Sequence, residues 1–244
     1  MRLSLMTWPE VEAHLATSTA AIVPIGSTEQ HGPTGLIGTD ALCAEAVANG
    51  VGEACGAVVA PVLSIGMAVH HLGFSGTLTL RPSTLMAVLR DVVESLAGHG
   101  FRRILFVNGH GGNVSTLRAA FMEIHGARAQ AQLPELRLDT LNWWQGRRVR
   151  ELCHSLYGDK EGAHATASEL ALTWGLFPER ADRRVLDPQV APIHRFQGPE
   201  DFRRNHPDGR MGSDPSLATE EDGRRLLELA IADVADAFRR FNEA

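Results

Sequence analysis

The sequence is poor in cysteine and lacks any long apolar run. Its three cysteines, Cys43, Cys55 and Cys153, lie far apart and form no CxxC pair. An odd, sparse set of this kind argues against a disulfide framework and against a structural zinc ribbon. No stretch approaches the roughly 20 apolar residues that a membrane span requires. The first 15 residues also lack the apolar core and small-residue cleavage site of a signal peptide. These absences predict a cytoplasmic protein with no membrane partner.

An excess of positive charge is also missing. The formal net charge is −6 and the pI is about 6.0, whereas a nucleic-acid-binding face is usually basic. Short arginine clusters do occur, but acidic residues lie among them, and we interpret them as solvated surface. They lie at residues 102–103, 147–150 and 183–184. The charge therefore predicts no nucleic-acid partner.

What the sequence does contain is an alternation of strand-like and helix-like segments. Hydrophobic residues make up 44% of the chain and charged residues 21%, which is ordinary for a globular enzyme. Apolar runs predict strands at 20–26, 57–63, 103–108 and 136–143, and helical spacing predicts helices at 39–55, 82–96, 113–128, 163–174 and 219–241. This alternation predicts an α/β fold with a mostly parallel sheet that is covered on both faces.

One stretch interrupts the alternation. Residues 177–216 are rich in Pro, Asp, Arg and Gly and show little periodicity. We interpret this stretch as a surface excursion or a subunit contact rather than a second domain. The sequence shows no internal repeat and no low-complexity tract, so we expect residues 1–244 to form a single domain.

The loop after the first predicted strand contains polar residues that could bind metal. It reads GSTEQHG, which places Glu29 and His31 two residues apart, and Asp40 follows nine residues beyond His31. Alternate side chains of an extended segment point the same way, so Glu29 and His31 can face one site. Two carboxylates and an imidazole suit Zn²⁺ or Mn²⁺. The same residues also fit a polar turn with Asp40 capping a helix, and the pattern alone leaves both open.

The loop after the third predicted strand reads NGHGGN and contains His110. Glycines on both sides of His110 let its backbone approach a ligand closely. A histidine in a loop after a buried strand has no obvious structural use, so we favour a role in the site. For Asn113, which ends this motif, we expect the structural role of capping the next helix.

Two further segments are more ambiguous. His164 and Glu169 are five residues apart, so on a regular helix they would point in different directions. They could still line one cavity if His164 lies at the helix entrance and Glu169 one turn in; otherwise they form an acidic turn with an exposed glutamate. The neighbouring His70 and His71 are best used in lining a pocket. Trp143, at the end of a predicted strand, could form a wall of that pocket, although most tryptophans at such positions pack in the core.

Taken in order, these segments resemble the creatininase (creatinine amidohydrolase) family. The motifs that carry the resemblance are MTWPEV at 6–11, PIGSTEQHG…TD at 24–40, GxxxxHxxFxGT at 66–77, NGHGGN at 108–113, HAxxxE at 164–169 and GxDPxxAT at 212–219. They span most of the chain. The resemblance implies a three-layer α/β/α single domain with a dinuclear metal centre at the carboxyl edge of its sheet.

The resemblance also implies a ligand set. Glu29 and His110 would hold one ion, His31 the other, and Asp40 would bridge the two. Creatininase takes a further carboxylate from inside the NGH motif, where this chain has Gly112. In relatives with the same double glycine this carboxylate comes from the HAxxxE segment, which makes Glu169 the expected fifth ligand. Mixed carboxylate and imidazole ligands accept Zn²⁺, Mn²⁺ or Fe²⁺.

The chemistry that the family implies is hydrolysis of a carbon–nitrogen bond. Two ions lower the pKa of a shared water and supply hydroxide as the nucleophile, and Glu169 takes part as a ligand. His164 is our candidate for carrying a proton to the departing nitrogen. We expect His70, His71 and Trp143 to contact the substrate. Members of the family are often homo-oligomers, so we expect a homo-oligomer, with a hexamer as one arrangement.

The chain departs from the family pattern around its ligands. The usual HAG…ETS is replaced by His164-Ala-Thr and Glu169-Leu-Ala, and Ala163 stands where an acidic residue is common. We therefore expect an amidohydrolase that acts on a small cyclic amide or a formamide, without assigning creatinine itself. The alternatives are a peptidase that trims a small precursor peptide, as in mycofactocin maturation, and a non-catalytic metal-binding protein on the same fold.

Overall fold

The core of the structure, a computed structural model that describes residues 1–243, is a parallel sheet. Its strand order is β2-β1-β3-β4, with β1 at Ala20–Ile25, β2 at Val58–Val59, β3 at Arg103–Asn108 and β4 at Arg137–Asn142. Strands β1, β3 and β4 pair over their full length, so that Ile25, Asn108 and Asn142 are level. The loops that follow β1 and β3 therefore begin side by side at one edge of the sheet.

The second predicted strand is shorter than expected. Residues 57–63 were predicted as a strand, but β2 covers only Val58–Val59. Beyond it the chain still runs along β1, because Ala60 N donates to Ile22 O and Leu63 N donates to Pro24 O. The regular ladder ends because the register changes between these two bonds: Ala60 and Leu63 are three residues apart, whereas Ile22 and Pro24 are two apart.

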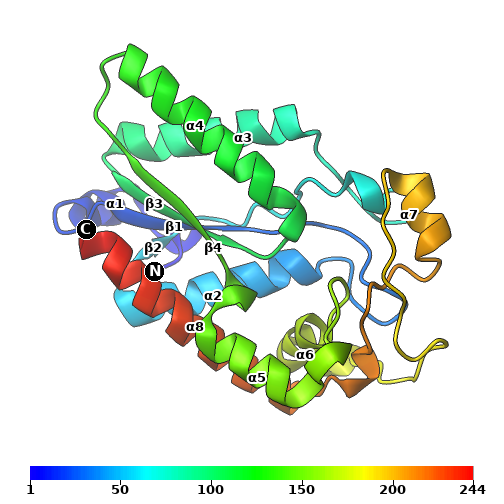
Figure 1. The fold of residues 1–244 in the computed structure, drawn as a ribbon. Helices are drawn as coiled ribbons and strands as arrows, with labels where there is room; N and C mark the ends of the chain where they lie inside the picture. Colours follow the sequence, from blue (N-terminus) through cyan, green and yellow to red (C-terminus); the bar gives the residue numbers. More distant parts are fainter. Residues whose placement is uncertain (244) are drawn as a thin grey trace.

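Helices cover both faces of the sheet (Figure 1). Alternate residues of β1 point to opposite faces, so Ile22 joins one buried cluster and Val23 the other. The face of Ile22 packs against α2 (Thr39–Cys55), α5 (Arg147–Tyr157), α6 (Ala167–Leu176) and α8 (Glu220–Glu243), and the face of Val23 packs against α1 (Trp8–Leu15), α3 (Pro82–His99) and α4 (Val114–Gln130). The prediction of a three-layer α/β/α fold is confirmed.

The helix α6 begins later than predicted. A helix was expected from residue 163, but residues 163–166 are extended or turned, and Ala165 has a left-handed φ of 51°. Thr166 then starts the helix as its N-cap, and its hydroxyl accepts from the backbone N–H of Glu169. His164 thus lies outside the helix, in the loop that leads into it.

The 177–216 stretch contains little regular structure, as predicted, but it is not a loose surface loop. It includes the short helix α7 (Pro199–Asn205), which lies beyond the carboxyl ends of the strands (Figure 1). The guanidinium of Arg210 is fully buried and donates to the carbonyls of Pro188, Gln189 and Ser213. A buried cation needs such partners, and these fix the path of the stretch next to the sheet edge.

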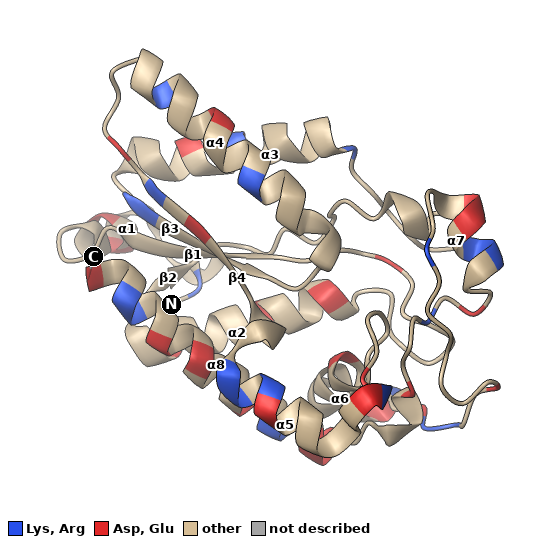
Figure 2. Ribbon diagram, viewed as in Figure 1, with Lys and Arg blue, Asp and Glu red and all other residues tan. Residues whose placement is uncertain are grey.

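The remaining elements are short 3₁₀ helices in the loops. They are η1 (Leu3–Leu5), η2 (Val69–His71), η3 (Gly111–Asn113), η4 (Trp143–Gln145), η5 (Gly158–Lys160), η6 (Pro178–Arg180) and η7 (Pro215–Leu217). Charged residues of both signs occur on α5 and α8, and no large region of one sign stands out in Figure 2. Among the residues described, no helix is long and apolar enough to cross a membrane.

Candidate metal centre

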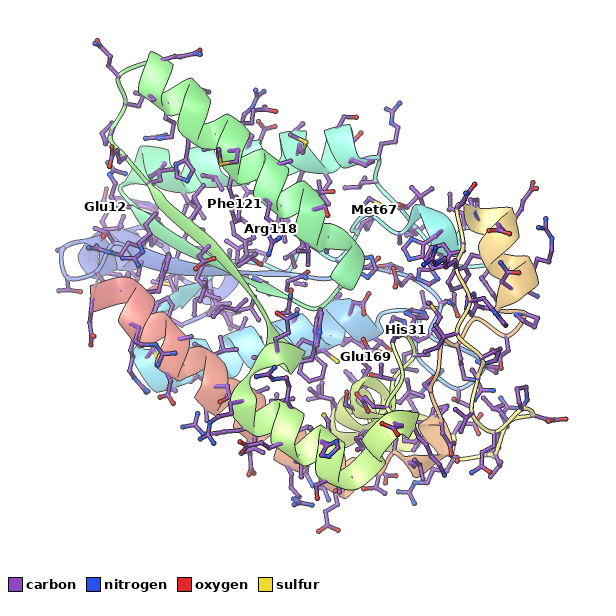
Figure 3. All side chains as sticks on the ribbon, viewed as in Figure 1. Glu12, His31, Met67, Arg118, Phe121 and Glu169 are labelled. Carbon is purple, nitrogen blue, oxygen red and sulfur yellow. The ribbon has the colours of Figure 1, made fainter. Side chains whose placement is uncertain are left out.

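Five predicted ligands converge beyond the carboxyl ends of β1 and β3. Glu29 and His31 come from the loop after β1, His110 from the loop after β3, Asp40 from the first turn of α2 and Glu169 from the first turn of α6. Glu29, His31, Asp40 and His110 are buried, and Glu169 is partly exposed. Figure 3 shows the labelled His31 and Glu169 close together, between α2 and α6.

Three overlapping groups of three side chains have the spacing of metal ligands; one joins His164 to Glu29 and His31, and the other two contain Asp40. In each group the potential ligand atoms lie within 4.8 Å of one another: Glu29, Asp40 and His110 form the first group, and His31, Asp40 and Glu169 form the second. Asp40 belongs to both. Its Oδ2 lies 3.0 Å from Nδ1 of His110, and its Oδ1 lies 3.1 Å from Nε2 of His31. One carboxylate thus faces both groups, as a bridging ligand would.

The imidazoles of the cluster are oriented by backbone carbonyls. Nε2 of His110 lies 3.0 Å from Met67 O, which leaves Nδ1 facing Glu29 and Asp40. Nδ1 of His31 lies 3.2 Å from Glu29 O, which leaves Nε2 facing Asp40. Histidine ligands commonly donate their second ring N–H in this way, which fixes the tautomer and the ring orientation.

The burial of Glu29 provides a test of whether the cluster fits a cation. Neither carboxyl oxygen of Glu29 makes a well-aligned hydrogen bond to any residue that the structure describes. One of them, Oε1, is 3.2 Å from His110 Nδ1 and 3.3 Å from His71 Nε2. A fully buried carboxylate without such bonds is costly unless a positive charge compensates it. The residues present therefore fit a divalent ion.

The charges of the cluster also fit a bound cation. Burial opposes protonation of His31, but the facing carboxylate of Asp40 outweighs it and raises the pKa of His31 to about 10. Burial likewise opposes ionisation of Asp40, yet His31 and His110 hold the pKa of its carboxyl below the usual range. Without an ion, protons on the imidazoles supply the positive charge. A metal ion that binds here must displace these protons, which makes its affinity depend on pH.

Glycines at two strand ends allow α2 to approach the sheet. A Cβ on Gly26 would lie 2.3 Å from Ala41 N, and a Cβ on Gly109 would lie 2.1 Å from Asp40 O. Both distances are too short for any side chain. These glycines therefore let the first turn of α2 carry Asp40 between the two loops, which explains the glycines of the GSTEQHG and NGHGGN motifs.

The NGHGGN loop differs from the prediction at its last residue. Asn113 was expected to cap α4, but its side chain makes no capping bond. Instead its Nδ2 donates to Gly26 O and its Oδ1 accepts from Met67 N, so it connects three loops. Within the same motif, a Cβ on Gly112 would lie 2.3 Å from Nε2 of His110. In this conformation the loop has no room for a carboxylate at that position.

His164 and Glu169 face one cavity, although their spacing would separate them on a regular helix. His164 lies before α6, and its Nδ1 is 3.8 Å from Oε1 of Glu29. Glu169 is in the first turn of α6, and its Oε2 accepts from the N–H and the hydroxyl of Thr166, both at 2.9 Å. This capping box occupies one oxygen of Glu169, while the carboxyl still faces His31 and Asp40.

Gln30 organises the histidines around the cluster, and the sequence analysis did not single it out. Its Nε2 lies within 3.0 Å of three atoms: His71 Nδ1, His164 Nε2 and Gly209 O. The two hydrogens of the Gln30 amide are donated to Nδ1 of His71 and to the carbonyl oxygen of Gly209. His164 Nε2 then donates to Gln30 O at 2.8 Å, so its Nδ1 is the free acceptor. The only sequence signal for this role was the position of Gln30 between Glu29 and His31.

A cavity of about 950 Å³ opens next to the cluster. Four histidines line it, His70, His71, His110 and His164, and the other lining residues include Trp144, Arg150, Cys153, His154 and Glu161. Phe196 and Met211 reach it from the 177–216 stretch. Because that stretch has no periodic pattern, their position could not be predicted from the sequence.

The pocket-lining predictions have different outcomes. His70 and His71 both line the cavity, and burial lowers the pKa of His70 to about 4, with a further contribution from His110. Trp143 does not line it: its side chain is fully buried in the core next to α2 and α8. The prediction for Trp143 is corrected to Trp144, because the 3₁₀ turn η4 directs the second indole to the cavity.

Comparisons with known proteins agree with this architecture. The family model for creatininase, described as creatinine amidohydrolase, matches residues 4–238. The chain is 30% identical to the creatinine amidohydrolase of Pseudomonas putida, over 96% of this chain and 94% of that protein. It is 29% identical to the mycofactocin precursor peptide peptidase of Mycobacterium ulcerans (strain Agy99), over 96% and 86%.

Solved structures match over the whole chain. The Mn form of a creatininase has a TM-score of 0.89 and 27% identity, and the match covers 100% of this chain and 99% of that one. A mutant creatininase of the Zn–Zn type has the same TM-score and identity, with coverage of 100% and 98%.

Proposed function

The chain belongs to the creatininase family of metal-dependent amidohydrolases, and from this premise we propose that it hydrolyses a carbon–nitrogen bond of a small cyclic amide or a formamide. The observation that carries the proposal is the position of Asp40, with one oxygen toward each of two ligand groups. A bridging carboxylate of this kind is what a dinuclear hydrolase needs to hold two ions beside one shared nucleophile.

The ligand assignment follows the two groups. Glu29, His110 and Asp40 would hold one divalent ion, and His31, Asp40 and Glu169 the other. Zn²⁺, Mn²⁺ and Fe²⁺ all suit this donor set, and the relatives of known structure include Mn and Zn–Zn forms. When bound, two such ions supply a hydroxide at neutral pH and polarise the carbonyl of the substrate.

His164 is assigned the proton transfer. Because its Nε2 donates to Gln30 O, its Nδ1 can accept a proton on the side of the cluster and release it to the departing nitrogen. Burial, together with the nearby His31, lowers the pKa of His164, so the ring starts neutral and able to accept. The retention of this oriented imidazole beside the ligands favours catalysis over a purely metal-binding role.

The other cavity residues would position the substrate. His71 is held between Gln30 and Glu29 through its two ring nitrogens, so it would provide a fixed wall for the substrate close to the ions. His70 stacks on Phe196, with ring centroids 5.2 Å apart, and forms part of the wall. Trp144 provides an apolar surface opposite. Together they would hold a flat amide with its carbonyl toward the cluster.

The peptidase alternative is favoured by one observation, the position of Arg150. Arg147 pairs with Glu151 and Arg148 pairs with Asp233 and Asp236. Arg150 makes no ion pair with any residue in 1–243, and it lines the cavity. It could therefore bind the carboxylate of a peptide, and the large cavity leaves room for one.

A substrate panel tests these proposals. The protein, reconstituted with Zn²⁺ or Mn²⁺, is assayed against cyclic amides, formamides and short peptides. Hydrolysis of a cyclic amide or a formamide supports the leading proposal, and hydrolysis of peptides alone replaces it with the alternative. In that case Arg150→Gln should raise KM about tenfold for peptides with a free carboxylate and leave their amidated forms unchanged. Full metal occupancy without any hydrolysis would contradict both.

Three further proposals concern the state of the protein. We propose that residues 1–244 act as one creatininase-like domain, which the match over residues 4–238 supports. We propose a cytoplasmic protein without nucleic-acid or membrane partners, which its free cysteines and net negative charge support. We also propose a homo-oligomer, such as a hexamer. Exposed apolar side chains, including Leu72 and Leu78 on the loops near the site, support this proposal.

A further inference from the structure

One carboxyl group on the cavity has no place in the mechanism above. Glu161 lies between η5 and the His164 loop, is partly buried and lines the cavity. Both of its oxygens accept hydrogen bonds from Ser168, one from the backbone N–H at 3.2 Å and one from the hydroxyl. Ser168 is in the first turn of α6, directly before the ligand Glu169.

A second hydroxyl continues the row of contacts toward the metal cluster. The Ser168 hydroxyl, which donates to Glu161, lies 3.2 Å from the hydroxyl of Thr166, and the Thr166 hydroxyl donates to Oε2 of Glu169 at 2.9 Å. The two hydroxyls therefore hold each other in place by close contact, while each donates to its own carboxylate. Glu161, Ser168, Thr166 and Glu169 therefore form a continuous row of polar contacts. The row links a carboxyl that touches no ligand directly to the carboxyl assigned to the second ion.

The row also provides hydrogen-bond acceptors for backbone N–H groups at the start of α6. The first N–H groups of a helix have no partner within the helix. Here Glu161 accepts from Ser168 N, while the Thr166 hydroxyl accepts from Glu169 N. Two acceptors from outside the helix thus fix the turn that carries Glu169. With Oε2 of Glu169 occupied by Thr166, Oε1 is the oxygen left for a ligand bond.

The second ion site depends on this arrangement more than the first. Glu29, Asp40 and His110 are all buried at strand ends or at the helix next to them. In the second group, Glu169 is the only carboxylate besides the shared Asp40, it is partly exposed, and Gly112 provides no substitute. Any rotation of Glu169 would remove a third of the protein ligands of that ion.

We propose that Glu161 is a positioning residue for the ion held by His31, Asp40 and Glu169, and that it acts through the hydroxyls of Ser168 and Thr166. This inference rests on the proposed dinuclear function. It assigns a role to a residue that makes no contact with either ligand group, and it predicts that the two ions respond differently to the same change.

Calorimetric titration of the metal-free full-length protein with Zn²⁺ alone tests this. Wild-type protein should bind two ions. In Glu161→Ala and in Ser168→Ala the affinity for one ion should fall by about 10- to 100-fold, the usual effect of removing an outer hydrogen-bond partner of a ligand, while the other affinity stays within twofold. Glu161→Gln keeps an acceptor oxygen for Ser168 and should restore most of the affinity. Ser95→Ala, which removes an exposed hydroxyl on α3, is the matched control.

The outcomes separate this inference from the proposed function. If wild-type protein binds fewer than two ions, the dinuclear proposal fails. If wild type binds two and the Glu161 and Ser168 variants match it, or lose both ions equally, Glu161 is only a helix cap and the inference fails. Circular dichroism of each variant establishes folding. If Glu161→Ala does not fold, the Ser168→Ala and Glu161→Gln pair decides.

Discussion

The two halves of the candidate metal centre are built in different ways. Glu29, Asp40 and His110 lie where strands β1 and β3 end, and glycines at 26 and 109 let the backbones meet there. His164 lies on a loop and donates to the backbone carbonyl of Gln30. Glu169 lies in the first turn of a helix and accepts from the hydroxyl of Thr166, which also contacts Ser168. The comparison teaches that backbone packing positions the first half, whereas a network of polar side chains positions the second.

The largest effect is expected from a change of Asp40, which belongs to the ligand groups of both proposed ions. Asp40→Ala should remove both metal ions and with them all measurable hydrolysis, because each ion loses a ligand and the buried imidazoles of His31 and His110 lose the carboxylate that faces them. Metal analysis of the purified variant measures this, with Asp91→Ala on the exposed face of α3 as control. Retention of one ion would show that Asp40 does not bridge.

A change in the second half should separate chemistry from metal binding. His164→Ala should keep two ions and lower kcat by about a hundredfold or more, because a positioned proton carrier contributes about 10²- to 10⁴-fold. Steady-state kinetics and metal analysis of the same sample measure both effects. Loss of an ion in this variant would show that His164 is a metal ligand. Its Nδ1 lies 3.8 Å from Oε1 of Glu29, so the same variant tests this alternative.

A glycine tests the backbone packing of the first half. In Gly109→Ala the new Cβ would lie 2.1 Å from Asp40 O, so we expect a loss of about 1–3 kcal/mol in the free energy of unfolding and weaker binding of both ions. Gly98→Ala in α3 is the control, since a Cβ there meets nothing within 4 Å, and it should stabilise the protein by up to about 1 kcal/mol. Equal effects in urea denaturation would contradict the packing argument.

The smallest effect is a pH dependence in the second half. Burial raises the pKa of Glu161 to about 7, well above that of a solvated glutamate, and nearby Glu169 adds to this. The folded state then holds this proton more tightly than the unfolded state, so ionisation costs stability as pH rises through this window. Between pH 5.5 and 8, wild type should lose about 2 kcal/mol more than Glu161→Gln. Parallel urea curves measure it, and equal losses would contradict the shift.

The contrast between the halves also explains what could be predicted from the sequence. Apolar runs predicted strands near β1, β3 and β4. The motifs after β1 and β3 contain Glu29, His31 and His110. Their proximity could be expected because loops that follow neighbouring parallel strands begin side by side. The five expected ligands do come together in space. That they bind metal stays a prediction.

The second half could not be read from periodicity. His164 and Glu169 line the same cavity because Ala165 has a left-handed φ and α6 starts late. Neither feature produces a helical or strand periodicity in the sequence. The choice between Trp143 and Trp144 depends on one 3₁₀ turn, in which neighbouring residues point in different directions. Glu161 and Gln30 act through hydrogen bonds, which leave no trace in apolar spacing.

The buried guanidinium of Arg210 has a consequence for how this chain can vary. The guanidinium pairs with the carboxylate of Asp208, and its other bonds reach main-chain carbonyls at Pro188, Gln189 and Ser213, which every amino acid provides. Substitutions at the exposed positions between them can therefore accumulate without altering the route of the chain past the cavity. Arg210 itself cannot be exchanged so freely, since a lysine has no planar fork to reach several acceptors at once.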